Sequence, residues 1–170
     1  MSRIHAGILA VSLCAVAVGC STPGGAQKGG DEGPAREAFE SLQQAIKAKD
    51  ADKMWALLDE DSQADAEREA GGIRDAYAKA DDAGKKELEK NLGLPGAKLA
   101  GLKGPGFLET RRFLGKYDEV ADSKVEKVTV EKDRATVNYL EPDGDKEKFT
   151  LTRQQGKWKL SVPMPKGTPR

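Results

Sequence analysis

The sequence has few of the residues that most often carry chemistry. Its 170 residues include one histidine and two cysteines. His5 and Cys14 both lie in an N-terminal segment that we expect to be removed, which leaves Cys20 as the remaining cysteine. A mature chain of this kind has no intramolecular disulfide. It also lacks a cysteine nucleophile, a histidine general base and a histidine metal site, and it contains no glycine-rich phosphate loop, HExxH motif or GxSxG motif.

An excess of one charge is also missing. Lysine and arginine together number 28, as do aspartate and glutamate. Nucleic-acid binding depends on basic groups that neutralise phosphates, and it is usually visible as a basic excess. We therefore expect no nucleic-acid partner.

Long hydrophobic runs are absent as well. The uncharged apolar run Ala6–Val18 follows Arg3 and is shorter than the roughly 20 residues that span a bilayer. It matches the apolar core of a secretory signal peptide, which takes about 7–15 residues. A buried N-terminal helix of a cytosolic domain is the alternative, but the run has no amphipathic stripe and a glycine-rich segment follows it.

The end of this run, Ala17-Val18-Gly19-Cys20, resembles the lipobox of bacterial lipoproteins, although the family more often has leucine at the position of Ala17. The resemblance implies a signal peptide of residues 1–19, diacylglycerol on the Cys20 thiol and anchoring in a membrane of the bacterial cell envelope. Ser21 stands where an aspartate would favour inner-membrane retention, so the outer membrane is favoured. The alternative is an ordinary signal peptide cut near Ala17 or Gly19, with Cys20 as a free thiol.

Residues 20–33 have the composition of a tether. They are rich in glycine and contain no large apolar side chain. A flexible coil of this length spans on the order of 20 Å. The remaining residues, 34–170, have the length of one ordinary domain.

The first half of this domain has the periodicity of helices. The first expected helix runs from Pro34 to Lys49, and the second, capped by Asp50, covers 51–60. The third begins at Ser62, runs from Gln63 to about Ala80 and is weakened at Gly71-Gly72. The fourth is capped by Asp81 or Asp82 and ends at Gly93, and the last covers 107–117. The segment Leu94–Gly106 is rich in glycine and proline, and we expect a loop that is either a lid or a simple connection.

The second half alternates with a period of two, which predicts four strands: 124–130, 135–141, 146–153 and 157–162. Short turns between them favour an antiparallel meander. One face of this sheet is apolar and the other carries mostly Lys, Glu, Thr, Asn and Ser. The helices are expected to cover the apolar face, which gives an α+β fold with a curled four-stranded sheet.

This order of helices and strands resembles the cone-shaped nuclear transport factor 2-like fold, and more narrowly the small bacterial lipoproteins of unassigned function that contain it. The segments that carry the resemblance are MWALLDEDS, FLETRRFLGKY and GKWKLSV, and the likeness extends from Pro34 to Pro163. Isomerases, cyclases and dehydratases of this fold use Asp, His or Tyr in a pocket inside the cone. The resemblance therefore implies a ligand pocket at the inward face of the sheet.

The candidate pocket residues are Trp55, Tyr139, Phe149 and Trp158. Tyr139 is the polar group among the expected inward strand positions. It is either a core tyrosine whose hydroxyl has a partner or a group that orients a ligand.

The other polar candidates have simpler explanations. Asp59-Glu60-Asp61 and Asp81-Asp82 are expected in water, as loop and cap residues. Asp143-Gly144-Asp145 is similar to part of a calcium loop, but a hairpin turn explains it better. Arg111-Arg112 could offer a cation to an acidic ligand.

Three functions are consistent with these observations. The favoured one is a lipid-anchored, non-enzymatic module that binds an envelope protein or a small apolar ligand, with no cofactor and no metal. An isomerase- or cyclase-type enzyme with Asp or Tyr as acid and base is the second, and a structural spacer is the third. The outward-facing Lys127, Lys148 and Lys159 favour a monomer.

Overall fold

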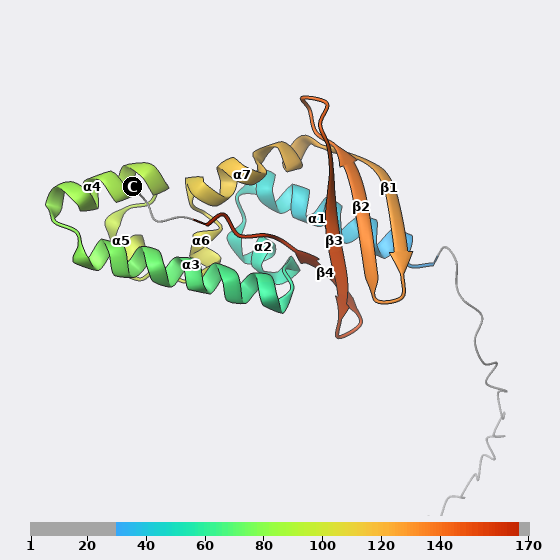
Figure 1. Ribbon diagram of the computed structural model, residues 1–170, viewed down its shortest axis with the longest axis horizontal. Helices are drawn as coiled ribbons and strands as arrows, with labels where there is room; N and C mark the ends of the chain where they lie inside the picture. Colours follow the sequence, from blue (N-terminus) through green and yellow to red (C-terminus); the bar gives the residue numbers. More distant parts are fainter. Residues whose placement is uncertain (1–29, 167–170) are drawn as a thin grey trace, which may run out of the picture.

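The computed structural model describes residues 30–166, in which helices precede a four-stranded sheet (Figure 1). The helices are α1 (Glu32–Ala48), α2 (Ala51–Leu57), α3 (Glu60–Lys79), α4 (Asp82–Leu92), α5 (Gly96–Ala100), α6 (Gly104–Phe107) and α7 (Arg111–Asp122). The strands are β1 (Lys124–Glu131), β2 (Arg134–Leu140), β3 (Lys146–Gln154) and β4 (Lys157–Ser161). The predicted α+β class is confirmed.

The sheet is the predicted antiparallel meander, in the order β1-β2-β3-β4. It is open, because β1 and β4 do not pair with each other. The register shifts between Val125 and Lys127 in β1, so Val125 and Val128 both stand opposite inward residues of β2. The free side of β4 is bridged in parallel by Leu58, at the end of α2.

The helices lie on one side of the sheet (Figure 1), and the core forms between the two layers. The inward strand positions are buried as predicted, at Val128, Ala135, Val137, Tyr139, Phe149, Leu151, Trp158 and Leu160. Helix α1 contributes the fully buried Phe39 and Leu42 to the same core. None of the helices within residues 30–166 is long and apolar enough to cross a membrane.

Several predicted helix ends are confirmed. Asp50 caps α2 by accepting a hydrogen bond from the amide of Lys53, and Asp81 caps α4 through the amide of Gly84. Gly93 ends α4 in the left-handed region, with φ of 71°. The first helix, however, begins at Glu32, which is inside the segment expected to be a tether.

The start of the third helix was predicted wrongly. Asp59, not Ser62, is its N-cap, and the helix runs without a break through Gly71-Gly72. Asp59 was expected in water but is buried, because its carboxylate also accepts a hydrogen bond from the Ser161 hydroxyl of β4. Glu60 and Asp61 are exposed as expected.

The segment 94–106 is not a loop. It contains α5 and α6, and its three leucines, Leu94, Leu99 and Leu102, are buried. Their burial ties the segment to the helical layer and makes it a packed connection rather than a lid.

The last predicted helix, over 107–117, is divided in two. Thr110 has extended backbone angles and caps α7 by accepting a hydrogen bond from the Phe113 amide at 3.3 Å. Phe107 therefore ends α6 while Phe113 lies in α7, and both are buried. Each end of an observed strand either coincides with the predicted end or differs from it by one residue.

Candidate functional site

One groove of the described domain follows from the unequal lengths of two neighbouring strands. β3 begins at Lys146, but its pairing with β4 begins only at Thr150. The chain leaves β4 after Ser161 and turns toward the helices (Figure 1). Within residues 30–166, the stretch 146–149 of β3 therefore has no pairing partner on this edge.

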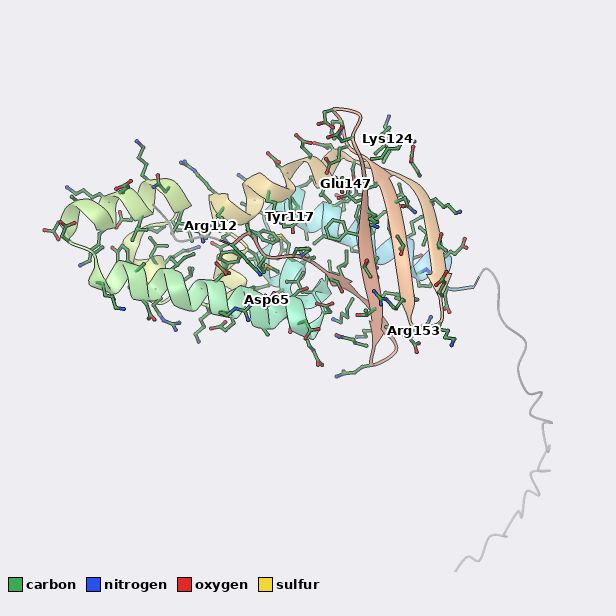
Figure 2. All side chains as sticks on the ribbon, in the orientation of Figure 1. Asp65, Arg112, Tyr117, Lys124, Glu147 and Arg153 are labelled. Carbon is green, nitrogen blue, oxygen red and sulfur yellow. The ribbon has the colours of Figure 1, made fainter. Side chains whose placement is uncertain are left out.

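Helix α7 faces this free edge and closes the other side of the groove, which has a volume of about 570 Å³. The lining residues are Lys116, Tyr117 and Val120 of α7, Arg134, Tyr139, Glu141, Glu147, Lys148, Phe149 and Thr150 of the sheet region, and Ser161 and Pro163 at the end of β4. The groove thus combines aromatic rings with a charged rim. Figure 2 labels two of its lining residues, Tyr117 of α7 and Glu147 of β3.

Aromatic rings form the base of the groove. The ring of Phe149 lies 5.8 Å from that of Tyr139 and 6.1 Å from that of Tyr117, measured between centroids. Behind them, Phe39 of α1 contacts both Tyr139 and Phe149. These rings pack against one another where the sequence predicted a ligand cavity, so the groove lies at the edge of the sheet rather than inside a cone.

Helix α7 is held in position by a buried glutamine of α1. The side-chain amide of Gln43 donates hydrogen bonds to the carbonyl oxygens of Val120 and Ser123, at 2.9 Å and 2.8 Å. These carbonyls lie at the C-terminal end of α7, where helical partners are missing. Tyr117 of α7 holds the segment that follows β4 in place, since its hydroxyl donates a hydrogen bond to the carbonyl oxygen of Pro163.

The two tyrosines of the groove differ in their hydrogen bonding. The Tyr139 hydroxyl forms no hydrogen bond within residues 30–166, although only 5% of the residue is exposed. Burial raises the pKa of Tyr139, and the charges of Glu141 and Glu147 raise it further. Burial also raises the pKa of Tyr117. Both side chains thus stay protonated near neutral pH, when they can donate hydrogen bonds but cannot serve as general bases.

Three carboxylates meet at one end of the groove. Oxygen atoms of Glu119, Glu141 and Asp143 all lie within 4.8 Å of one another. Partial burial raises the pKa of Glu141, and the neighbouring Glu119 and Asp143 add to this effect. This is the group of described residues that could share a cation, but Glu119 and Asp143 are exposed to water.

The turn that contains Asp143 is the predicted hairpin. The amide of Gly144 donates to the carbonyl of Glu141, and the amide of Asp145 donates to the Asp143 carboxylate at 3.0 Å. Gly144 has a φ of 99°, which glycine adopts without strain. The turn's own hydrogen bonds therefore account for Asp143-Gly144-Asp145.

The other predicted pocket residues lie elsewhere. Trp158 is buried beneath the Arg153 guanidinium, which lies 4.7 Å from its ring centroid. Trp55 packs where Gly104 leaves room for its indole. Of the four candidates, Tyr139 and Phe149 line the groove and the two tryptophans do not. Cys20 lies outside the described residues.

The arginine pair of α7 has structural roles. Arg112 is largely buried and lies 3.6 Å from the Glu69 carboxylate of α3, and its Nη1 atom forms no hydrogen bond within the described chain. Arg111 donates to the carbonyl oxygen of Lys90, near the end of α4. Neither side chain lines the groove.

The sequence analysis missed the helical wall and the free strand edge. Tyr117 and Lys116 fall in a helix that was predicted, but nothing in the sequence indicated that this helix would face β3. Pro163 was an available signal, since proline interrupts strand pairing and stands directly after the last strand. It marks where β4 separates from β3.

Comparison with protein-family models gives no match, and neither curated proteins nor solved structures show significant similarity to this chain.

Proposed function

We propose that the protein is a non-enzymatic binding module, anchored to the bacterial cell envelope through lipid on Cys20, that holds an extended segment of a partner protein along the free edge of β3. The observation that carries this proposal is the unpaired stretch 146–149, which faces a groove of about 570 Å³. An unpaired strand edge presents backbone donors and acceptors, and adding a partner strand satisfies them.

The groove suits a peptide chain. Its aromatic base offers contacts to every second side chain of an added strand, while the rim offers both Lys116 and Glu147 to polar side chains. The unpartnered hydroxyl of Tyr139 provides a further hydrogen-bond donor.

The alternatives have less support. A small apolar ligand inside the fold would have to displace the packed rings of Phe39, Tyr139 and Phe149. An acid–base enzyme would need a carboxylate with a raised pKa inside an enclosed cavity, whereas Glu141, whose pKa is raised, lies at one end of the groove beside the exposed Glu119 and Asp143.

The wider assignment is part of the same proposal. Helices come first in the chain and cover the apolar face of the meander that follows them. This arrangement supports kinship with nuclear transport factor 2-like domains, although the sheet is open.

The lipobox-like residues Ala17–Cys20 support an envelope location, with the outer membrane favoured. When membranes are washed in about 1 M salt, which screens electrostatic attachment, a Cys20→Ala variant is expected to move from the membrane fraction to the soluble fraction. Retention of this variant in the membrane fraction would contradict lipid anchoring.

Photocrosslinking tests whether a partner protein binds along the free edge of β3. We would place a photoreactive amino acid at Glu147 of the full-length chain in living cells, with Glu87 on α4 as the matched exposed position. We expect an adduct from position 147 that position 87 does not give. A synthetic peptide with the crosslinked partner segment should then slow amide hydrogen exchange in residues 146–149.

Two results would contradict the proposal. One is an identical adduct pattern from both positions. The other is a peptide that binds but leaves exchange in residues 146–149 unchanged, since a paired strand protects backbone amides.

A further inference from the structure

We propose that the open face of the sheet is an electrostatic docking surface for an anionic phospholipid bilayer, with its basic groups next to the headgroup phosphates. This surface adjoins the edge groove, because Arg134, Lys148, Thr150 and Ser161 line the groove as well, but the proposal does not depend on the partner proposed above. It rests on which side chains the strand register brings together.

Lysines occupy two adjacent cross-strand rows on this face. In one row Leu140 stands between Lys124 and Lys146, and in the next Asn138 stands between Lys127 and Lys148. All four lysines are exposed. Neighbouring strands are about 4.8 Å apart, so these ammonium groups form a compact patch, which we call the lysine patch.

Ion pairing neutralises little of the lysine patch. Lys146 lies 3.5 Å from Glu126, and both side chains are largely open to water, where such pairs are weak. Lys124, Lys127 and Lys148 take part in no ion pair within residues 30–166. A hollow of about 580 Å³ lies here, lined by Lys127, Lys146 and Lys148, by Asn138 and Tyr139, and by the carboxylates of Glu126 and Glu147, which offset part of this charge.

The rest of this face of the sheet also carries polar and charged side chains. The next row consists of Thr129, Thr136, Thr150 and Ser161, side by side across all four strands. Arg134 and Lys157 are exposed at further outward positions, and the exposed Glu131 stands opposite Arg134. The whole chain has equal numbers of basic and acidic residues, so this excess leaves the remainder of the chain acidic. The molecule is therefore polarised, which would turn this face toward an anionic surface.

A bilayer fits this face better than nucleic acid does. The outward strand positions have no aromatic side chain on which bases could stack. A membrane surface requires only clustered cations, each of which strengthens attraction to anionic lipid. The helices leave the face uncovered, and the described chain begins beside the end of β1 (Figure 1). A lipid on Cys20 would hold the face within a tether's reach of the bilayer.

Vesicle flotation tests the proposal. A chain that begins at Ser21 keeps every helix and strand that the structure describes and lacks the lipidated cysteine. We expect it to float with vesicles of equal parts phosphatidylglycerol and phosphatidylcholine, and not with phosphatidylcholine alone. Binding should be lost in about 1 M salt, where the Debye length is about 3 Å.

The decisive comparison uses two double variants with equal net charge. Lys127→Ala with Lys148→Ala removes half of the lysine patch, whereas Lys86→Ala with Lys90→Ala removes two exposed lysines of α4. At about fivefold per lysine, the first pair should weaken vesicle binding about 25-fold, and the second should leave it nearly unchanged.

Three results would overturn the proposal: no binding to the anionic vesicles, equal weakening by both pairs, or binding to duplex DNA in place of vesicles. Far-ultraviolet circular dichroism of both variants verifies that the lost lysines, not a lost fold, account for the difference.

Discussion

At the scale of single residues, Asp59 joins the two layers of the fold. One carboxylate oxygen accepts the Ser62 amide at 2.8 Å and caps α3, while the other accepts the Ser161 hydroxyl of β4. The Asp59 amide also donates to the carbonyl of Leu160. This one residue therefore fixes the position of β4 and, through it, the place where the groove opens.

Replacing Asp59 with alanine should lower the free energy of unfolding by about 2 kcal/mol, the upper range for the loss of an N-cap. The partly buried Ser161 hydroxyl loses its partner in the same variant. Urea denaturation measures the change. Asp75→Ala, at an exposed position in the C-terminal part of α3, is the control and should change stability by less than about 0.5 kcal/mol. Equal effects of the two changes would contradict this role for Asp59.

Because the pKa of Glu141 is raised, we expect the stability of the protein to depend on pH. This pKa is raised in the folded state by partial burial and by Glu119 and Asp143, so the folded chain binds more protons than the unfolded chain between the two pKa values. The free energy of unfolding therefore falls as pH rises through this range, and the penalty is fully present above it.

Glu141→Gln should remove this penalty. We expect it to stabilise the protein by about 0.5 kcal/mol near neutral pH and to have no effect below a pH of about 3, where the carboxyl is protonated in both states. Urea denaturation across this pH range measures the difference, with the exposed Glu87→Gln as control. Stabilisation that is the same at both ends of the range would contradict repulsion as its cause.

At the scale of elements, the connection from α4 to α7 depends on two close approaches. A Cβ atom on Gly96 would lie 2.0 Å from the Tyr77 hydroxyl, which is hydrogen-bonded to Glu89. A Cβ atom on Gly104 would lie 2.5 Å from the indole of Trp55. The glycines that made this segment look like a loop in the sequence are the positions where it packs against α2, α3 and α4.

Gly104→Ala should therefore destabilise the protein by about 1–3 kcal/mol, the usual cost of overpacking. Gly101→Ala is the matched control, since a Cβ atom there would meet nothing within 4 Å. Thermal and urea denaturation compare the two. If Gly101→Ala costs as much as Gly104→Ala, the packing explanation fails.

At the scale of the whole molecule, burial is uneven. Helix α4 lies at the end away from the sheet (Figure 1) and has two buried residues, Leu88 and Leu92. Helix α1 lies against the sheet and buries six residues, among them Phe39 and Leu42. Local opening requires less free energy where fewer apolar contacts are broken.

Native-state hydrogen exchange should follow this difference. Amides of residues 86–92 should exchange faster than those of residues 36–46 under conditions where the domain stays folded. Mass spectrometry of peptides from these two segments makes the comparison within one sample. Equal protection in both segments would mean that the helical end opens only with the whole domain.

Much of the fold was predictable because its signals are local. The period of two placed the strands, and Asp50, Asp81 and Gly93 marked helix ends through side-chain or backbone preferences that act within a few residues. The candidate site was predictable only in part. Tyr139 and Phe149 follow from strand alternation, but Tyr117 and Lys116 enter the groove because of how α7 packs.

The sequence by itself determined the α+β class, the meander and which face of each strand is apolar, since periodicity and turn residues are properties of neighbouring positions. Only the tertiary structure decided that Asp59 rather than Ser62 caps α3, that residues 94–106 are packed, and that β4 leaves β3 at Thr150. It also brought the four lysines of the lysine patch together. These features depend on contacts between residues far apart in the chain, which no local pattern specifies.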